Sequence, residues 1–146
     1  MTTIAWDGKT LAVDSQFSEG AFKYYQNKMM TYTRGFWSSC GEAADDAIFQ
    51  ALLDGEKPLR KKIGKRSACL FTKDGEVWSI DPVGYVSPAP IPYAIGSGAE
   101  LAIGAMYAGQ SAVDAIKTVS KISPYTSGDI KAVTVKTGKL QTIKNA

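Results

Sequence analysis

The most informative absence from this 146-residue sequence is histidine, of which the chain contains none. Histidine is the usual general base at neutral pH, so no serine–histidine or cysteine–histidine pair can carry chemistry here. Cysteine is also scarce, and Cys40 and Cys69 form neither a disulfide framework nor a metal-ligand pattern. We therefore expect two reduced, buried thiols in a cytoplasmic protein, with no metal and no cofactor.

Long apolar runs and strong charge are absent too. No hydrophobic stretch approaches the length of a membrane span, and the first residues lack the basic and apolar regions of a signal peptide. The net charge of +3 is too small to argue for nucleic acid. We expect a single domain over residues 1–146, with a mature chain of 2–146 and no membrane or nucleic-acid partner.

One basic segment, residues 56–66, stands out from this balance. It is either a docking patch for an acidic partner or a solvated surface connection. We favour the second interpretation, because no aromatic residues interleave with the basic ones. The segment's basic residues are Lys57, Arg60, Lys61, Lys62, Lys65 and Arg66.

What the sequence does contain is a threonine directly after Met1. If Met1 is removed, Thr2 carries both a β-hydroxyl, which is a nucleophile, and a free α-amine. The reference pKa of an α-amine is about 7.7–8.0, so this amine is a general base near neutral pH. One residue then supplies the pair that a serine–histidine site builds from two. The alternative interpretation is that the segment merely starts an edge strand.

Periodicity changes along the chain and predicts an order of strands and helices. Strands are expected over 3–6, 10–15, 35–41, 67–71, 76–81, 130–135 and 140–143, with two short strands within 22–33, and loops over 17–20 and 82–94. Helical spacing begins at Glu42 and ends at Gly55, a second helix includes 101–106, and Ser111 caps a third. This order fits an α+β fold of stacked sheets with a helical layer on each outer side.

Five short motifs occur in a recognisable order. They are Thr2-Thr3-Ile4, Ala12-Val13-Asp14-Ser15-Gln16, Lys28-Met29, Cys40-Gly41-Glu42-Ala43-Ala44-Asp45 and Ala94-Ile95-Gly96-Ser97-Gly98-Ala99-Glu100. Together they resemble proteasome β subunits and the bacterial HslV, and also small proteasome-like proteins of bacteria and their phages. The resemblance covers nearly the whole chain. It implies the four-layer αββα sandwich of N-terminal nucleophile hydrolases and threonine peptidase activity.

The resemblance also implies the catalytic roles. Thr2 matches the nucleophile, and Asp14 matches the acid that positions a catalytic lysine. Lys28 matches that lysine, whose charge would stabilise the Thr2 alkoxide and keep the Thr2 amine neutral. Lys23 is the rival assignment, and an ordinary cross-strand ion pair is the structural alternative for Asp14 and Lys28.

Further residues match the surroundings of the family's nucleophile. Gly41 matches the glycine whose backbone N–H forms the oxyanion hole, although a glycine is also common before a helix. Ser97 matches a serine that helps to relay the nucleophile's proton, and its alternative role is a turn before a helix. The resemblance assigns substrate binding to Ser18, Ser39 and Ala43, of which Ser39 and Ala43 wall the pocket for the residue before the cleaved bond.

One site residue departs from the family pattern. The family has an acid, two further residues and then a hydroxyl near the end of its last conserved helix; here Ser123 and Thr126 stand there. Thr126 supplies a hydroxyl, but Ser123 cannot supply a carboxylate, so its hydrogen bonds to the site would be weaker.

Partners also follow from the resemblance. It implies a peptide or unfolded-protein substrate, a homo-oligomer of stacked rings and a possible ATP-dependent unfoldase. The alternative function is a catalytically inactive scaffold for assembly or partner binding.

Overall fold

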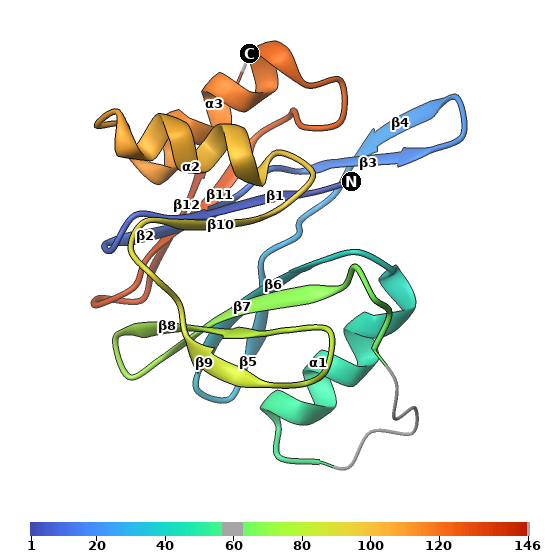
Figure 1. The fold of residues 1–146 in the computed structure, drawn as a ribbon, viewed down its shortest axis with the longest axis vertical. Helices are drawn as coiled ribbons and strands as arrows, with labels where there is room; N and C mark the ends of the chain where they lie inside the picture. Colours follow the sequence, from blue (N-terminus) through green and yellow to red (C-terminus); the bar gives the residue numbers. More distant parts are fainter. Residues whose placement is uncertain (57–62, 146) are drawn as a thin grey trace.

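The computed structural model describes residues 1–56 and 63–145, and two sheets stacked face to face dominate it (Figure 1). The strands of the first sheet are, in spatial order, β10 (Tyr93–Gly96), β1 (Thr3–Trp6), β2 (Thr10–Val13), β11 (Ile130–Thr134) and β12 (Lys139–Ile143). Those of the second are β5 (Met30–Tyr32), β6 (Gly35–Cys40), β7 (Ala68–Lys73), β8 (Glu76–Ile80) and β9 (Val86–Pro88). A separate hairpin, β3 (Gln16–Glu19) and β4 (Phe22–Tyr25), extends beyond the sheets (Figure 1).

Helices cover the outer face of each sheet. The helices α2 (Ala99–Tyr107) and α3 (Ala112–Ile122) lie on the first sheet, whereas η1 (Ala43–Asp45) and α1 (Asp46–Leu53) lie beside the second (Figure 1). The pairs of neighbouring strands in both sheets are antiparallel. The expected α+β class is therefore confirmed.

The alternation of side chains along β1 explains why this strand lies in the middle of the molecule. Ile4 and Trp6 point into the apolar core between the two sheets, whereas Ala5 points toward α2 and α3. Successive residues of a strand face opposite sides, and here both sides are covered, so β1 is buried along its whole length. Alanines such as Ala5 and Ala12 let the helices approach their sheet closely.

The expected loop over residues 17–20 is wrong, because most of it is the strand β3. Phe17 lies opposite Tyr24, and their rings stack with centroids 5.4 Å apart and planes 10° apart. Stacked cross-strand aromatic pairs stabilise antiparallel strands, and this pair depends on a partner seven residues away. The break expected between two short strands near Gln26-Asn27 is confirmed by β4 and β5.

The expected loop over residues 82–94 is also wrong in part. Val86–Pro88 forms β9 at the edge of the second sheet. Proline is tolerated in an edge strand, because it lacks an N–H and one side of such a strand has no partner strand to receive one. Tyr93–Gly96 forms β10 and pairs along the whole of β1. Four prolines nearby mask both strands in the sequence.

Other expectations fall at the ends of helices or outside the described residues. Ser111 caps α3 as expected, because its Oγ accepts a hydrogen bond of 3.1 Å from the N–H of Asp114. Cys40 and Cys69 are buried free thiols, as predicted. Most of the basic segment, residues 57–62, lies outside the described residues. Within the described ranges, no helix is long and apolar enough to cross a membrane.

Candidate functional site

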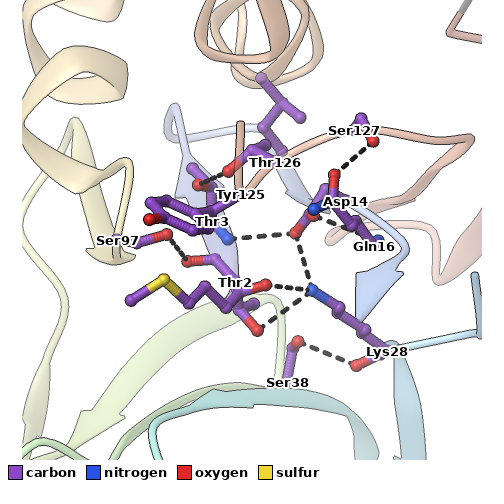
Figure 2. A network of polar contacts seen from close by, with 12 residues as sticks. Thr2, Thr3, Asp14, Gln16, Lys28, Ser38, Ser97, Tyr125, Thr126 and Ser127 are labelled. Atoms are coloured by element: carbon purple, nitrogen blue, oxygen red, sulfur yellow. Dashed lines mark hydrogen bonds and ion pairs between the residues drawn. The ribbon is translucent and has the colours of Figure 1, made fainter. Parts of the chain in front are cut away.

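The side chain of Lys28 is the centre of a polar network at the beginning of β1 (Figure 2). Its Nζ donates hydrogen bonds to the Thr2 hydroxyl at 3.1 Å, to the Met1 carbonyl at 2.8 Å and to Asp14 Oδ1 at 3.2 Å. Lys28 is only 6% exposed. The strand β6 holds the backbone of Lys28 in place, since the hydroxyl of Ser38 on β6 donates a 2.8 Å hydrogen bond to the Lys28 carbonyl.

Asp14 follows β2 and is completely buried. Besides the ion pair with Lys28, its carboxylate accepts hydrogen bonds from the N–H of Thr3 at 3.1 Å and of Gln16 at 3.2 Å. Asp14 therefore ties the lysine to the strand that carries the threonines. An ion pair at this depth contributes little to stability, because desolvation offsets the attraction, but it fixes the position of the Lys28 ammonium.

Burial shifts the pKa values of both members of this pair toward their neutral forms. Burial raises the pKa of Asp14, and the charge of Lys28 opposes that rise. Burial likewise lowers the pKa of Lys28, and the charge of Asp14 opposes the fall. The Phe17 ring also attracts the Lys28 ammonium, since Nζ lies 5.0 Å from the ring centroid. The result is a desolvated positive charge directly beside the Thr2 hydroxyl.

The backbone of Thr2 is held from the opposite side by β10. The Thr2 carbonyl accepts hydrogen bonds from the N–H of Ser97 at 2.8 Å and from the Ser97 hydroxyl at 3.4 Å. Gly96 has φ +101°, and a Cβ there would lie 1.8 Å from the Thr2 carbonyl oxygen. Only glycine permits this approach. Ser97 therefore contacts the Thr2 carbonyl, whereas the resemblance implied that it helps to relay the proton of the nucleophile.

A cavity of about 300 Å³ opens beside Thr2 and Lys28. Gly41, Ser18, Ser39 and Ala43 all line it, so the structure brings every expected substrate-binding residue to the threonine. Gly41 has φ +102°, and a Cβ would lie 2.4 Å from the Ser67 hydroxyl. The position thus requires glycine for backbone conformation and for space.

Ser123 and Thr126 follow α3, and their hydroxyls form hydrogen bonds with residues other than Thr2. The Ser123 hydroxyl accepts a 3.1 Å hydrogen bond from the N–H of Tyr125 and so closes its own turn. The Thr126 hydroxyl lies 2.7 Å from that of Thr3 rather than reaching Thr2. The structure therefore brings Thr126 next to the network and leaves Ser123 outside its hydrogen bonds.

The positions of Lys23 and Lys28 decide which of the two lysines contacts Thr2. Lys23 lies on β4 and is exposed, opposite Ser18 in the hairpin register. It lines a different depression, which it shares with Ser15 and Tyr25. Lys28, and not Lys23, contacts Thr2.

Sequence reasoning missed Gln16, which is 1% exposed. Its Nε2 donates to the Pro124 carbonyl at 2.9 Å and to the Ser18 hydroxyl at 3.0 Å, and its Oε1 accepts from the Ser127 hydroxyl. Gln16 therefore ties β3 to the segment after α3 (Figure 2). The available signal was its position two residues after Asp14, which puts both side chains on one side of an extended chain.

The network can activate a hydroxyl, and it offers no metal centre. Among residues 1–56 and 63–145, no group of three or more acidic, cysteine or histidine side chains could hold a metal ion. The pKa of the Met1 amino group is lowered, first by burial and then by the charge of Lys28. The Met1 amine is thus biased toward its neutral, proton-accepting form.

No protein-family model matches the chain, and no curated protein matches it. Among solved structures, the chain is similar to Thiobacillus denitrificans BPH, alone and in complex with epoxomicin. Both have a TM-score of 0.69 at 15% identity; each alignment covers 99% of this chain, with 98% of BPH in the complex and 99% of BPH alone. At this identity the likeness concerns the fold alone.

These comparisons correct the family expected from the motifs. The prediction that the chain is a proteasome β subunit or HslV relative, of bacterial or phage type, is wrong: the structural neighbours are BPH, and no family model supports the assignment. The physical reason is that the five motifs are short. Two of them also satisfy a local demand of the backbone, since Gly41 and Gly96 have positive φ angles.

Proposed function

We propose that this chain is a threonine-type hydrolase that cuts peptide bonds, with the Thr2 hydroxyl as nucleophile after Met1 is removed. One observation carries the proposal: the buried Lys28 ammonium, paired with Asp14, lies 3.1 Å from the Thr2 hydroxyl oxygen. A positive charge at that distance in a desolvated setting stabilises negative charge on the oxygen. The carbonyl of Met1, 2.8 Å from the same ammonium, leaves with the removed residue.

The reaction proceeds through an ester on Thr2. The freed Thr2 amine takes the proton of the Thr2 hydroxyl as its oxygen attacks the carbonyl carbon of the peptide bond. The resulting oxyanion accepts a hydrogen bond from the backbone N–H of Gly41, which lines the same cavity. The amine then returns the proton to the departing nitrogen as the C–N bond breaks. Water then attacks the ester carbonyl carbon and passes a proton to the amine. The C–O bond to Thr2 breaks, the amine returns that proton to the Thr2 oxygen, and the second product leaves as a carboxylic acid.

Lys28 acts without exchanging its proton. As an ammonium it lowers the free energy of the developing alkoxide and discourages protonation of the nearby amine by like-charge repulsion. Asp14 holds it in place through the 3.2 Å ion pair. Ser97 holds the Thr2 carbonyl, so the hydroxyl and the amine are carried by a fixed backbone.

We further propose that the fold is the four-layer αββα sandwich of N-terminal nucleophile hydrolases. Two observations support it: helices lie on the outer faces of both sheets, and the fold resembles that of BPH over nearly the whole chain. BPH has been solved in complex with epoxomicin, which makes a peptide epoxyketone a reasonable probe for this chain. We propose that the active form is a homo-oligomer that encloses the Thr2 face in a chamber, and that an ATP-dependent unfoldase delivers substrate to it.

The test is covalent labelling of the protein, after mass spectrometry has established that Met1 is absent. A peptide epoxyketone can bond to both the amine and the hydroxyl of an N-terminal threonine, and an internal threonine offers no such amine. We expect one adduct per chain, located on Thr2, and loss of the adduct and of peptide cleavage in Thr2→Ala. Thr2→Ser keeps part of both, because the hydroxyl and the amine remain.

The contrary result is equally specific. If trimmed protein forms no adduct and cleaves no peptide in a broad library, the hydrolase proposal is overturned. The position of Ser123, whose hydroxyl closes its own turn, would then favour a non-catalytic scaffold.

A further inference from the structure

Acidic side chains surround the cavity beside Thr2. Glu19 at the end of β3, Glu42 before η1 and Asp46 at the start of α1 all line it together with Thr2 and Lys28. Glu42 and Asp46 belong to one segment, residues 42–46, whereas Glu19 comes from the β3–β4 hairpin, so the fold brings two separate segments to the cavity. The cavity itself is defined independently, by its position at the Thr2 hydroxyl.

The charges of these carboxylates are not compensated within the cavity. Lys28 is the cationic side chain in the lining, and its charge is already paired with Asp14 at 3.2 Å. In the part of the chain that the structure describes, no ion pair involves Glu19, Glu42 or Asp46. Glu42 also borders a neighbouring depression lined by Lys65 and Arg66, whereas Glu19 and Asp46 do not. The carboxylates of Glu19 and Asp46 attract a cation and repel an anion.

Asp46 is the most constrained of the three carboxylates. It is half-buried, and its Oδ1 accepts a hydrogen bond from the hydroxyl of Ser39 on β6. Burial, opposed by that hydrogen bond and reinforced by the charge of Asp45, raises the pKa of Asp46. A carboxylate that is poorly solvated in this way gains most from a cation placed against it.

The remaining walls suit an aliphatic chain. The stacked rings of Phe17 and Tyr24, together with Met30 and Ala43, line the cavity between the carboxylates. Lysine and arginine side chains lay their methylene stems along apolar surface and keep the charged end for a polar partner. A volume of about 300 Å³ is at the lower end for small-ligand sites and suits a single long side chain.

We propose that this cavity takes the side chain preceding the cleaved bond and selects lysine or arginine there, with Asp46 as the specificity-determining partner of the cation. The inference rests on the proposed peptidase function for its meaning in catalysis. The recognition of a basic side chain can be measured separately as binding.

The experiment compares matched peptides with arginine, lysine, norleucine or glutamate before the cleaved bond. Norleucine matches the stem of lysine without its charge. We expect the highest kcat/KM for arginine and lysine and the lowest for glutamate. Asp46→Asn, which keeps the side-chain volume, should lower kcat/KM for arginine about tenfold to a hundredfold, from the loss of one charge-assisted contact, and leave norleucine nearly unchanged.

Two further variants guard the interpretation. Glu42→Gln alters an exposed acid of the same cavity, so it should reduce the arginine preference less and serves if Asp46→Asn folds poorly. Glu76→Gln, on β8 and outside the cavity lining, is the matched control and should change neither substrate.

Binding separates this inference from the proposed function. Fluorescence anisotropy of peptides ending in arginine or norleucine, with wild type and Asp46→Asn, reports the preference without catalysis. Binding of the arginine peptide that depends on Asp46, without any cleavage, would support the cavity and overturn the hydrolase. Cleavage without preference for basic residues would overturn the inference alone. If the protein neither cleaves peptides nor binds the arginine peptide through Asp46, both the inference and the hydrolase proposal are overturned.

Discussion

At the scale of single residues, Lys28 decides whether Thr2 is chemically special. Lys28→Ala should reduce peptide cleavage by about a hundredfold to a thousandfold, the usual effect of removing one electrostatic stabiliser. The protein should still fold, because the pKa of Asp14 is already raised by burial and the unpaired carboxyl can take a proton. Lys23→Ala removes an exposed lysine that lines a different depression and serves as the matched control. Full activity of Lys28→Ala would reassign the role.

The same lysine predicts a pH dependence. Burial lowers the pKa of Lys28 from its usual 10.5, so the ammonium beside Thr2 loses its proton at a lower pH than an exposed lysine would. Activity should therefore fall on the alkaline side before pH 10.5, as the positive charge disappears. A profile of kcat/KM against pH measures this limb, with circular dichroism at each pH to verify folding. A rate that stays flat up to pH 10.5 in folded protein would contradict the shift.

At the scale of elements, the contact between β3 and the segment after α3 depends on one amide. Gln16→Leu should destabilise the protein by about 1–3 kcal/mol, because the Pro124 carbonyl and the Ser127 hydroxyl lose their partner. Peptide cleavage should also fall, since the backbone N–H that Gln16 donates to the Asp14 carboxylate would belong to a strand that has lost its side-chain contacts with the segment after α3. Urea unfolding measures the first effect.

The control for this change is another glutamine-to-leucine substitution. Gln110 is exposed and accepts a hydrogen bond from Thr118 at 2.8 Å. Gln110→Leu should change stability by no more than about 0.5 kcal/mol, as is usual for surface substitutions. Equal effects of the two substitutions would show that Gln16 does not brace the segment.

The sequence predicts those features that local pattern determines. Asp7-Gly8 and Ser111 mark a hairpin and a helix start, and both are present because turns and caps depend on nearby residues. The position of Lys28 at Thr2 came from a motif, and the structure brings the two together. By contrast, β10 owes its strand conformation to pairing with β1, some ninety residues earlier, so no local signal could reveal it. Gln16 escaped notice for the same reason, because its partners follow α3.

At the scale of the whole molecule, the hairpin of β3 and β4 predicts assembly. It extends beyond the sheets, all four residues of β4 are exposed, and Phe22 is 78% exposed (Figure 1). A two-stranded hairpin is marginally stable alone, so a second copy packed against it would stabilise it. We expect a homo-oligomer in light scattering and a smaller species for Phe22→Asp.

The contrary outcome for assembly is simple to recognise. A single species of 15.6 kDa at micromolar concentration would remove the enclosed chamber from the proposed function. Glu76→Gln, at the start of β8 on the second sheet, is the control and should leave the mass unchanged.

The place of β1 between β10 and β2 also sets the order of events during synthesis. The ribosome releases Thr2 some ninety-five residues before Ser97, whose N–H holds the Thr2 carbonyl. At about 5–20 residues per second, Thr2 waits for several seconds before that hydrogen bond can form. An aminopeptidase can trim Met1 in that interval, before β10 closes over the strand. A chain that escapes trimming then would carry its Met1 into the folded protein, where the carbonyl of Met1 is held by Lys28.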